Sequence, residues 1–311
     1  MSFGPLSFRR FSRRGRGAAA LAAALVLSLS MPAAARTLEV VASFSVLADM
    51  AREVGGDHVH VTSLVPPNGD PHEFEPTPDD AKRLRGADVA LTSGLGLEGW
   101  FARLAKASGY AGKPVVASDG IRPLKMDEDG AVVADPHVWN AIPNALVMTR
   151  NIEAALSAAA PGDAAAFKKN AEAYEAKLKA LDAYARAEID AIPKNSRKVL
   201  TTHDALGYFG AAYGVEFLSP LGITTGKDPS AAQMAKLIRQ IRAEGVRVYF
   251  FENSSDPRLV RQIAAATGAQ PGGELYVESL SGPDGPAPTY AAMFRYNVDT
   301  LVAAMKAAQK S

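Results

Sequence analysis

The chain has 311 residues, of which 48% are hydrophobic and 22% are charged, and its formal charge is +1. This composition is typical of a globular protein and excludes disorder or coiled coil as its main state. The length predicts about two domains. Cysteine is absent, which excludes disulfides, thiolate metal ligands, a cysteine nucleophile and a lipid-modified cysteine.

Residues 1–35 have the layout of a secretory signal peptide. Five arginines and no acidic residue precede the apolar run "AAALAAALVLSLS", and "MPAAA" then offers small residues at Ala33 and Ala35. Basic, apolar and small residues in this order predict export, with cleavage near Ala35. The apolar run is shorter than the roughly 20 residues that span a bilayer. A membrane anchor or a disordered tail is the alternative interpretation.

Removal of the five arginines changes the formal charge from +1 to −4. A mildly acidic chain is a poor electrostatic match for nucleic acid or for anionic lipid, so we expect neither as a partner. An exported chain without a lipidation cysteine is expected to be free in the bacterial periplasm.

Strands and helices alternate in residues 36–160, which we interpret as an N-terminal α/β lobe. Apolar, β-branched runs predict the strands, and amphipathic spacing with Ser caps or Gly stops predicts the helices. The predicted strands are 37–44, 58–66, 88–94 and 113–118, and the helices are 45–56, 79–87 and 99–109.

The alternation stops between about 142 and 192, where two helical patterns follow one another. The first ends at Pro161-Gly162, and the second runs through 164–192 without a breaker until Pro193. Because this pattern is much longer than an average helix, we interpret 161–193 as a rigid helix that links two lobes.

The alternation resumes in residues 194–311, the expected C-terminal lobe. Its predicted strands are 197–203, 215–221, 246–253 and 274–280, and its helices are 204–214, 228–245 (with Ser230 near the start), 256–268 and 289–309. The predicted fold class is therefore α/β, with two lobes that each hold a mostly parallel sheet flanked by helices.

Five histidines occur in the chain, and two share one tripeptide. His72 and His137 both lie in Asp-Pro-His, and His203 follows the strand "RKVLTT" directly. His58 and His60 alternate along one predicted strand, which places them on one side, and we expect them on a solvated edge.

Ligand sites of open α/β sheets lie beyond the carboxyl ends of the strands. His72 and His203 follow predicted strands, His137 lies in a loop just before the helical spacer, and Glu278 lies at the expected carboxyl end of the last strand. If the two lobes face each other, these four side chains can converge on the cleft. Three imidazoles and a carboxylate suit zinc. Spacing alone leaves open that each histidine is a structural residue.

Prolines and acidic residues surround these candidates. A proline precedes both His72 and His137, which stiffens the two loops. Asp70, Asp135 and Asp204 flank the histidines, and each could accept a hydrogen bond that fixes a ring tautomer.

Several stretches resemble the metal-binding solute receptors of bacterial ABC importers, the cluster A-I family of zinc- and manganese-binding proteins. They occur in the family's order over nearly the whole mature chain: "VVASFSVLADMAREVGGD", "VPPNGDPHEFEPTPDD", "GLGLEGWFARL", "DPHVWNAIPNALVM", "TTHDALGYFGAAYGVEF", "EGVRVYFFENSSDPRLVRQIA" and "LYVESLS…TYAAMFRYNVDTL". The resemblance implies two α/β lobes joined by a long helix that permits only small lobe motion. It also implies a high-affinity receptor that is not an enzyme and that delivers its metal to a permease.

The resemblance places the four ligands on His72, His137, His203 and Glu278. Relatives more often have aspartate at the last position, so the longer Glu278 could bind with another denticity or through water. Histidine at the third position is typical of zinc receptors, whereas glutamate there accompanies manganese. His203 therefore favours zinc, and manganese is the alternative.

Many zinc receptors of this family carry a long histidine-rich loop, which this chain lacks. The corresponding segment is the short, acidic "KMDEDGAVVAD" at 125–135, in which we expect a flexible flap around Met126–Glu128. The resemblance to the subgroup without the loop implies a periplasmic metallochaperone as a further candidate partner. We expect a monomer.

Two other classes of function are weighed against the receptor. A periplasmic zinc metallohydrolase could use the three histidines with Glu278 as the base, but the chain has neither an HExxH motif nor a Gly-x-Ser-x-Gly elbow. A receptor for an organic ligand would need aromatic walls and arginine clamps, whereas these motifs offer histidines.

Overall fold

The computed structural model describes residues 1–4, 36–128, 131–222 and 225–309. The predicted signal peptide, apart from its first four residues, lies outside this range. Residues 36–311 form one compact unit, and the following paragraphs describe that unit. Within the described residues, no helix combines the length and the apolar character that crossing a membrane requires.

The first parallel sheet forms the centre of the N-terminal lobe. Its order is β2-β1-β3-β4, with β1 at Leu38–Phe44, β2 at Val59–Val65, β3 at Val89–Thr92 and β4 at Val115–Val116. All residues of β1 except Glu39 are buried, as expected for a central strand with helices on both faces. Helices α1 (Ser45–Gly55), α2 (Pro78–Arg85) and α3 (Phe101–Ser108) follow the first three strands.

The second parallel sheet forms the centre of the C-terminal lobe. Its order is β10-β9-β7-β8, with β7 at Lys198–Leu200, β8 at Glu216–Leu218, β9 at Val248–Glu252 and β10 at Gln270–Leu275. Strand β9 therefore lies between β7 and β10, which precede His203 and Glu278. Helices α6 (Gly207–Tyr213), α7 (Ala231–Glu244), α8 (Arg258–Thr267) and α9 (Tyr290–Ala308) complete this lobe. These two sheets confirm the predicted fold class.

Ser230 lies near the start of α7, as predicted, and is its N-cap, so the helix begins three residues later than the expected 228. Its hydroxyl accepts a hydrogen bond from Gln233 N, and the Gln233 side chain accepts one from Ser230 N. This reciprocal capping box satisfies two backbone donors that the first turn would leave unpaired. The helix ends at Gly245, whose φ of 66° is a left-handed conformation that favours glycine.

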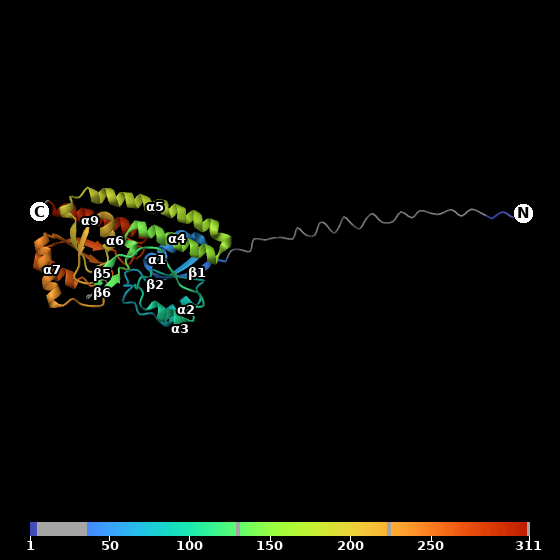
Figure 1. Ribbon diagram of the computed structural model, residues 1–311, viewed down its shortest axis with the longest axis horizontal. Helices are drawn as coiled ribbons and strands as arrows, with labels where there is room; N and C mark the ends of the chain where they lie inside the picture. Colours follow the sequence, from blue (N-terminus) through green and yellow to red (C-terminus); the bar gives the residue numbers. More distant parts are fainter. Residues whose placement is uncertain (5–35, 129–130, 223–224, 310–311) are drawn as a thin grey trace. The chain divides into compact units, whose positions relative to one another are not determined.

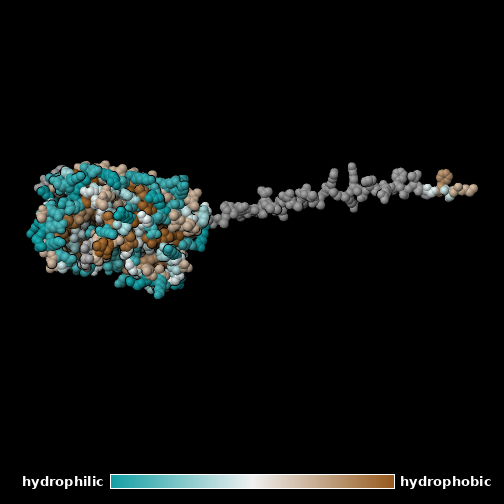
Figure 2. Space-filling view, in the orientation of Figure 1, coloured by the Kyte–Doolittle hydropathy of each residue, from teal (hydrophilic) through white to brown (hydrophobic). Residues whose placement is uncertain are grey.

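Helices α4 (Ile142–Ala159) and α5 (Ala164–Asp190) connect the two lobes. In Figure 1, α5 runs along both lobes, and the surface over it is mostly hydrophilic in Figure 2. Near its start Asn170 Nδ2 donates to Val54 O (3.1 Å), and near its end Arg186 Nη1 donates to Ala212 O (2.9 Å). The predicted linking helix is thus confirmed, whereas the lobe boundaries 36–160, 161–193 and 194–311 remain predictions.

Buried residues on one face of α5 explain how this helix is held. They recur every three or four residues, which places them on the same face: Phe167, Ala171, Tyr174, Leu178, Leu181, Ala185 and Ile189. This face packs on α4, α1, α9 and α6, so one helix closes the core of both lobes.

The last strand was predicted in the wrong place. We expected it at 274–280, but β10 spans Gln270–Leu275, so Glu278 lies beyond the strand rather than at its end. Pro271 is tolerated because β10 is an edge strand, with a register shift between Pro271 and Gly273. At Tyr276 the backbone bonds instead to Asn297 of α9, which accepts from Tyr276 N (3.0 Å) and donates to Tyr276 O (2.6 Å).

The segment 125–135, which was predicted to hold a flexible flap, contains two short strands. Strands β5 (Lys125–Glu128) and β6 (Ala131–Ala134) pair there in antiparallel fashion, and the flexibility of this segment stays a prediction. Four short 3₁₀ turns complete the described chain: Gly56–His58, Val138–Asn140, Pro161–Asp163 and Lys194–Ser196. His58 belongs to the first of these turns and not to a strand, which corrects its predicted place beside His60.

Candidate metal centre

The four predicted metal ligands come together. His72 lies in the loop after β2, His137 before the turn Val138–Asn140, His203 after β7, and Glu278 after β10. One ligand atom of each lies within 4.8 Å of the others. Four segments that are far apart in the sequence therefore converge on a single point.

One carboxylate oxygen lies close to all three imidazoles of this cluster. Glu278 Oε1 is 2.7 Å from His72 Nε2, 3.2 Å from His137 Nε2 and 3.2 Å from His203 Nε2. His72 Nε2 and His137 Nε2 are 3.1 Å apart. Ligands about 2.0–2.1 Å from a tetrahedral zinc ion are separated by about 3.3 Å. The spacing of these atoms therefore fits a small four-coordinate cation.

The site is sealed from solvent. The side chains of His137, His203 and Glu278 are 0% exposed, and that of His72 is 4% exposed. His203 Nε2 is buried and has no hydrogen bond of acceptable geometry within the described residues. A buried polar atom without a partner is costly, and a bound cation would satisfy this nitrogen.

The His72 loop is held by its own residues and by Trp100. Asp70 Oδ1 accepts a hydrogen bond from His72 N (2.7 Å), and Trp100 Nε1 donates to Pro71 O (2.8 Å). Thr225 Oγ1 donates to the other oxygen of Asp70 (2.5 Å). Asp70 was predicted to contact a ring N–H or nearby backbone, and it fixes the backbone.

Asp135 fixes both the backbone and the ring of His137. Its Oδ1 accepts from His137 N (2.9 Å) and lies 2.8 Å from His137 Nδ1. Because a carboxylate only accepts, the proton of the neutral ring lies on Nδ1, and Nε2 has a free lone pair toward the cluster. The predicted role of Asp135 is therefore confirmed.

Glu252, not Asp204, holds the ring of His203. Glu252 Oε2 is hydrogen-bonded to His203 Nδ1, and its Oε1 accepts from Thr202 N (3.0 Å) and His203 N (3.2 Å). Sequence reasoning missed Glu252. The signal was an acidic residue at the carboxyl end of the apolar strand "VYFFE", because His203 lies beyond the carboxyl end of the neighbouring strand β7.

The charges of the site interact strongly before any cation binds. Burial lowers the pKa of His203, but the carboxylates of Glu252 and Glu278 outweigh it and raise the pKa well above its usual value. Burial likewise lowers the pKa of His137, and hydrogen bonds to Asp135 and Glu278 raise it overall. Burial raises the pKa of Glu278, yet the surrounding imidazoles hold it well below its usual value. Protons therefore compete with a metal for this site.

The other two histidines lie outside the cluster. His60 Nδ1 is 2.8 Å from Glu39 Oε2, and its side chain is 67% exposed. His58 Nδ1 is 3.0 Å from Asp163 Oδ1 and is partly exposed. The predicted solvated position is confirmed for His60.

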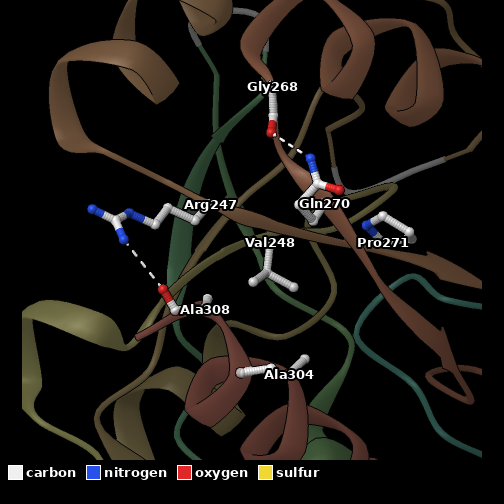
Figure 3. A pocket seen from close by; sticks show the side chains of 8 residues that line it. Arg247, Val248, Gly268, Gln270, Pro271, Ala304 and Ala308 are labelled. Carbon is white, nitrogen blue, oxygen red and sulfur yellow. Dashed lines mark hydrogen bonds between the residues drawn. The ribbon is translucent and has the colours of Figure 1, made fainter. Parts of the chain in front are cut away.

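A surface hollow of ≈ 560 Å³ lies at the amino ends of β9 and β10 in the second sheet. Figure 3 shows Val248 and Ala304 lining it, with Arg247 donating to Ala308 O (3.2 Å) and Gln270 to Gly268 O (3.0 Å). Val248 begins β9, whereas the metal cluster lies beyond its carboxyl end. This hollow is therefore separate from the candidate metal centre.

Comparison with known proteins identifies the family. Residues 40–304 match the family described as ZnuA, zinc-uptake complex component A, periplasmic. The chain belongs to this family. The ZnuA family comprises metal-binding receptors of ABC importers, not enzymes, which confirms the resemblance stated above.

Individual relatives agree with this assignment. The iron-binding protein YfeA of Yersinia pestis is 35% identical over 268 residues, which cover 86% of each chain. The manganese-binding lipoprotein MntA of Bacillus subtilis is 35% identical over 277 residues, covering 86% of this chain and 90% of its own. The structure of the periplasmic zinc binding protein TroA of Treponema pallidum has a TM-score of 0.82 at 30% identity, covering 86% of this chain and 99% of its own. Membership of the ZnuA family establishes a metal receptor. Because the names of these three relatives carry three different metals, the preferred metal of this chain has to be inferred from its own ligands.

Proposed function

We propose that this protein captures zinc in the periplasm and delivers it to the permease of an ABC importer. His72, His137, His203 and Glu278 are the proposed ligands. The observation that carries the proposal is the approach of three imidazole Nε2 atoms to one oxygen of Glu278, at 2.7–3.2 Å.

The donor set favours zinc over manganese. Three imidazoles and one carboxylate are typical of four-coordinate zinc, whereas manganese prefers six oxygen-rich ligands. The names of iron- and manganese-binding relatives keep a manganese or mixed-specificity receptor as the second candidate. A metallohydrolase is disfavoured because Glu278 lies among the imidazole nitrogens, where a ligand rather than a general base is expected.

The test is a competition titration of the metal-stripped mature protein against a chromophoric chelator, with zinc and then with manganese. We expect one tight zinc site and much weaker manganese binding. His203→Ala should lower zinc affinity sharply, and His60→Ala is the matched control because His60 is exposed and outside the cluster. Equal affinity for both metals would support the mixed-specificity alternative, and no tight site for either would refute both the zinc and the manganese proposal.

Export to the periplasm is part of the same proposal. The compact unit begins at Arg36, the residue after the expected cleavage position, where Arg36 Nη2 pairs with Asp88 at 2.5 Å and 2.6 Å. N-terminal sequencing of the periplasmic protein should begin at or near Arg36. A product that retains residues 1–35 would refute cleavage. A metallochaperone partner and a monomeric state are proposed with it, and pull-down from periplasm and analytical ultracentrifugation test them.

A further inference from the structure

Three consecutive residues at the carboxyl end of β9 lie against the segments that carry His203 and Glu278. Glu252 binds the ring and backbone of His203. Asn253 Nδ2 donates to Ser279 O (3.2 Å), next to Glu278, and Ser254 Oγ donates to Glu278 Oε2 (3.3 Å). This arrangement follows from sheet order, because β9 lies between the strands that precede the two ligands.

The two oxygens of Glu278 have different surroundings. Oε1 faces the three imidazole nitrogens. Oε2 accepts the hydroxyl hydrogen of Ser254. The Glu278 side chain is 0% exposed, so water cannot freely replace the Ser254 hydroxyl. The carboxylate is thereby oriented with one oxygen toward the metal position and the other away from it.

We propose that Ser254 is a specificity-determining residue, which holds Glu278 to a single ligand oxygen and so keeps the metal site four-coordinate. This inference rests on the proposed function, because it assumes that the four side chains bind a metal. Four ligands suit zinc, whereas manganese gains from additional oxygens. Ser254 would therefore disfavour manganese without contacting the metal.

Removal of the Ser254 hydroxyl has a defined consequence. In Ser254→Ala, the buried Oε2 loses its donor, and an unpaired buried carboxylate oxygen is costly. We expect the carboxylate of this variant to turn and to bind a cation through both oxygens. Manganese gains more than zinc from this fifth contact.

The chain supplies a matched control in the next residue. Ser255 is partly buried like Ser254, but its buried Oγ has no hydrogen-bond partner within the described residues. Ser255→Ala removes the same hydroxyl group one position away without touching Glu278. Ser254→Thr retains a hydroxyl and tests whether that group is what matters.

The experiment measures zinc and manganese dissociation constants of the mature wild type and the three variants. We expect Ser254→Ala to shift the manganese-to-zinc affinity ratio toward manganese by about tenfold, the equivalent of one hydrogen bond to a charged group. Ser255→Ala and Ser254→Thr should keep the wild-type ratio. The visible spectrum of the cobalt-substituted protein should be intense in the wild type, as for four ligands, and weaker in Ser254→Ala.

Each other outcome overturns the inference. An unchanged ratio and cobalt spectrum in Ser254→Ala would show that Ser254 does not set denticity. An equal loss of both affinities would make Ser254 a positioning residue without a role in specificity. The same shift in Ser255→Ala would assign the effect to general packing. If the wild type itself binds neither metal, the proposed function fails before this test begins.

Discussion

The substitution Glu252→Gln tests how the ring of His203 is prepared to bind metal. In the wild type, one oxygen of Glu252 accepts from the two backbone amides of Thr202 and His203, and the other is bonded to His203 Nδ1. Glutamine keeps its oxygen on the two amides, so its NH₂ faces Nδ1. An NH₂ group donates, which makes Nδ1 the acceptor and moves the ring proton to Nε2. That nitrogen is the one that faces Glu278 Oε1 at 3.2 Å.

Metal binding by this variant requires the less stable tautomer. Loss of an outer hydrogen bond of this kind typically costs about 10–100-fold in metal affinity, or about 1.4–2.8 kcal/mol. We expect this loss for zinc in the competition titration. The His203 nitrogen shifts in NMR spectra should report a proton on Nε2 in the metal-free variant. Asp256→Asn is the control, since Asp256 is an exposed carboxylate of the same segment, paired with Arg258.

Zinc affinity within about threefold of the wild type in Glu252→Gln would contradict the tautomer reasoning. A loss in Asp256→Asn equal to that in Glu252→Gln would also contradict it, because the effect would then arise from the charge of the segment rather than from the ring.

Three further predictions concern the pH dependence of zinc binding and two buried side chains, Asp49 and Trp139. Zinc affinity should fall as the pH drops, beginning above the ordinary histidine range near 6.5, because the raised pKa of His203 keeps its proton bound at higher pH. Zinc titrations at several pH values check this, and a constant affinity from about pH 8 to about pH 5 would contradict it. Asp49→Asn should stabilise the fold near pH 7 by at most about 3 kcal/mol, because burial raises the pKa of Asp49 from 3.8 to about 6 and the native state loses stability as the pH rises through that range. In urea unfolding, the gain in the free energy of unfolding should shrink toward about pH 4. An equal gain at both pH values would refute the raised pKa as its cause. Trp139→Phe should lower the free energy of unfolding by about 1–2 kcal/mol, because Val277 O loses its 2.7 Å bond from the indole N–H while buried; an unchanged urea midpoint would contradict this.

The order of elements was predictable because strands and helices have different periods. The long helix was predicted as 164–192 and observed at Ala164–Asp190, and Ser230 was correctly placed near the start of a helix. The last strand was predicted in the wrong place, because "QPGGEL" contains residues that disfavour strands, while "LYVESL" has a strand-like composition. Only the position of β10 at the sheet edge and the side chain of Asn297 explain the difference.

The four candidate ligands were predictable from motifs, whereas their supports were only partly so. Asp135 is two residues from His137, and local spacing is enough to suggest their contact. Glu252 is 49 residues from His203, and Ser254 is 24 residues from Glu278. Those contacts depend on β9 lying between β7 and β10. A single sequence does not reveal that order, so the nearer Asp204 was assigned to His203 instead.

Helix α1 near the start of the chain bonds to the segment that follows Glu278. Ser45 Oγ accepts from Leu280 N (3.0 Å), 235 residues later, and Asp49 Oδ2 accepts from Tyr290 N (2.8 Å), 241 residues later. Loops of this length close slowly, because their entropy is lost before the contact forms. The earliest helix of the fold therefore acquires its final partners only when the last tenth of the polypeptide has arrived. Maturation of the first lobe is thus tied to completion of the entire chain, and a nascent fragment that stops before residue 280 lacks both closures.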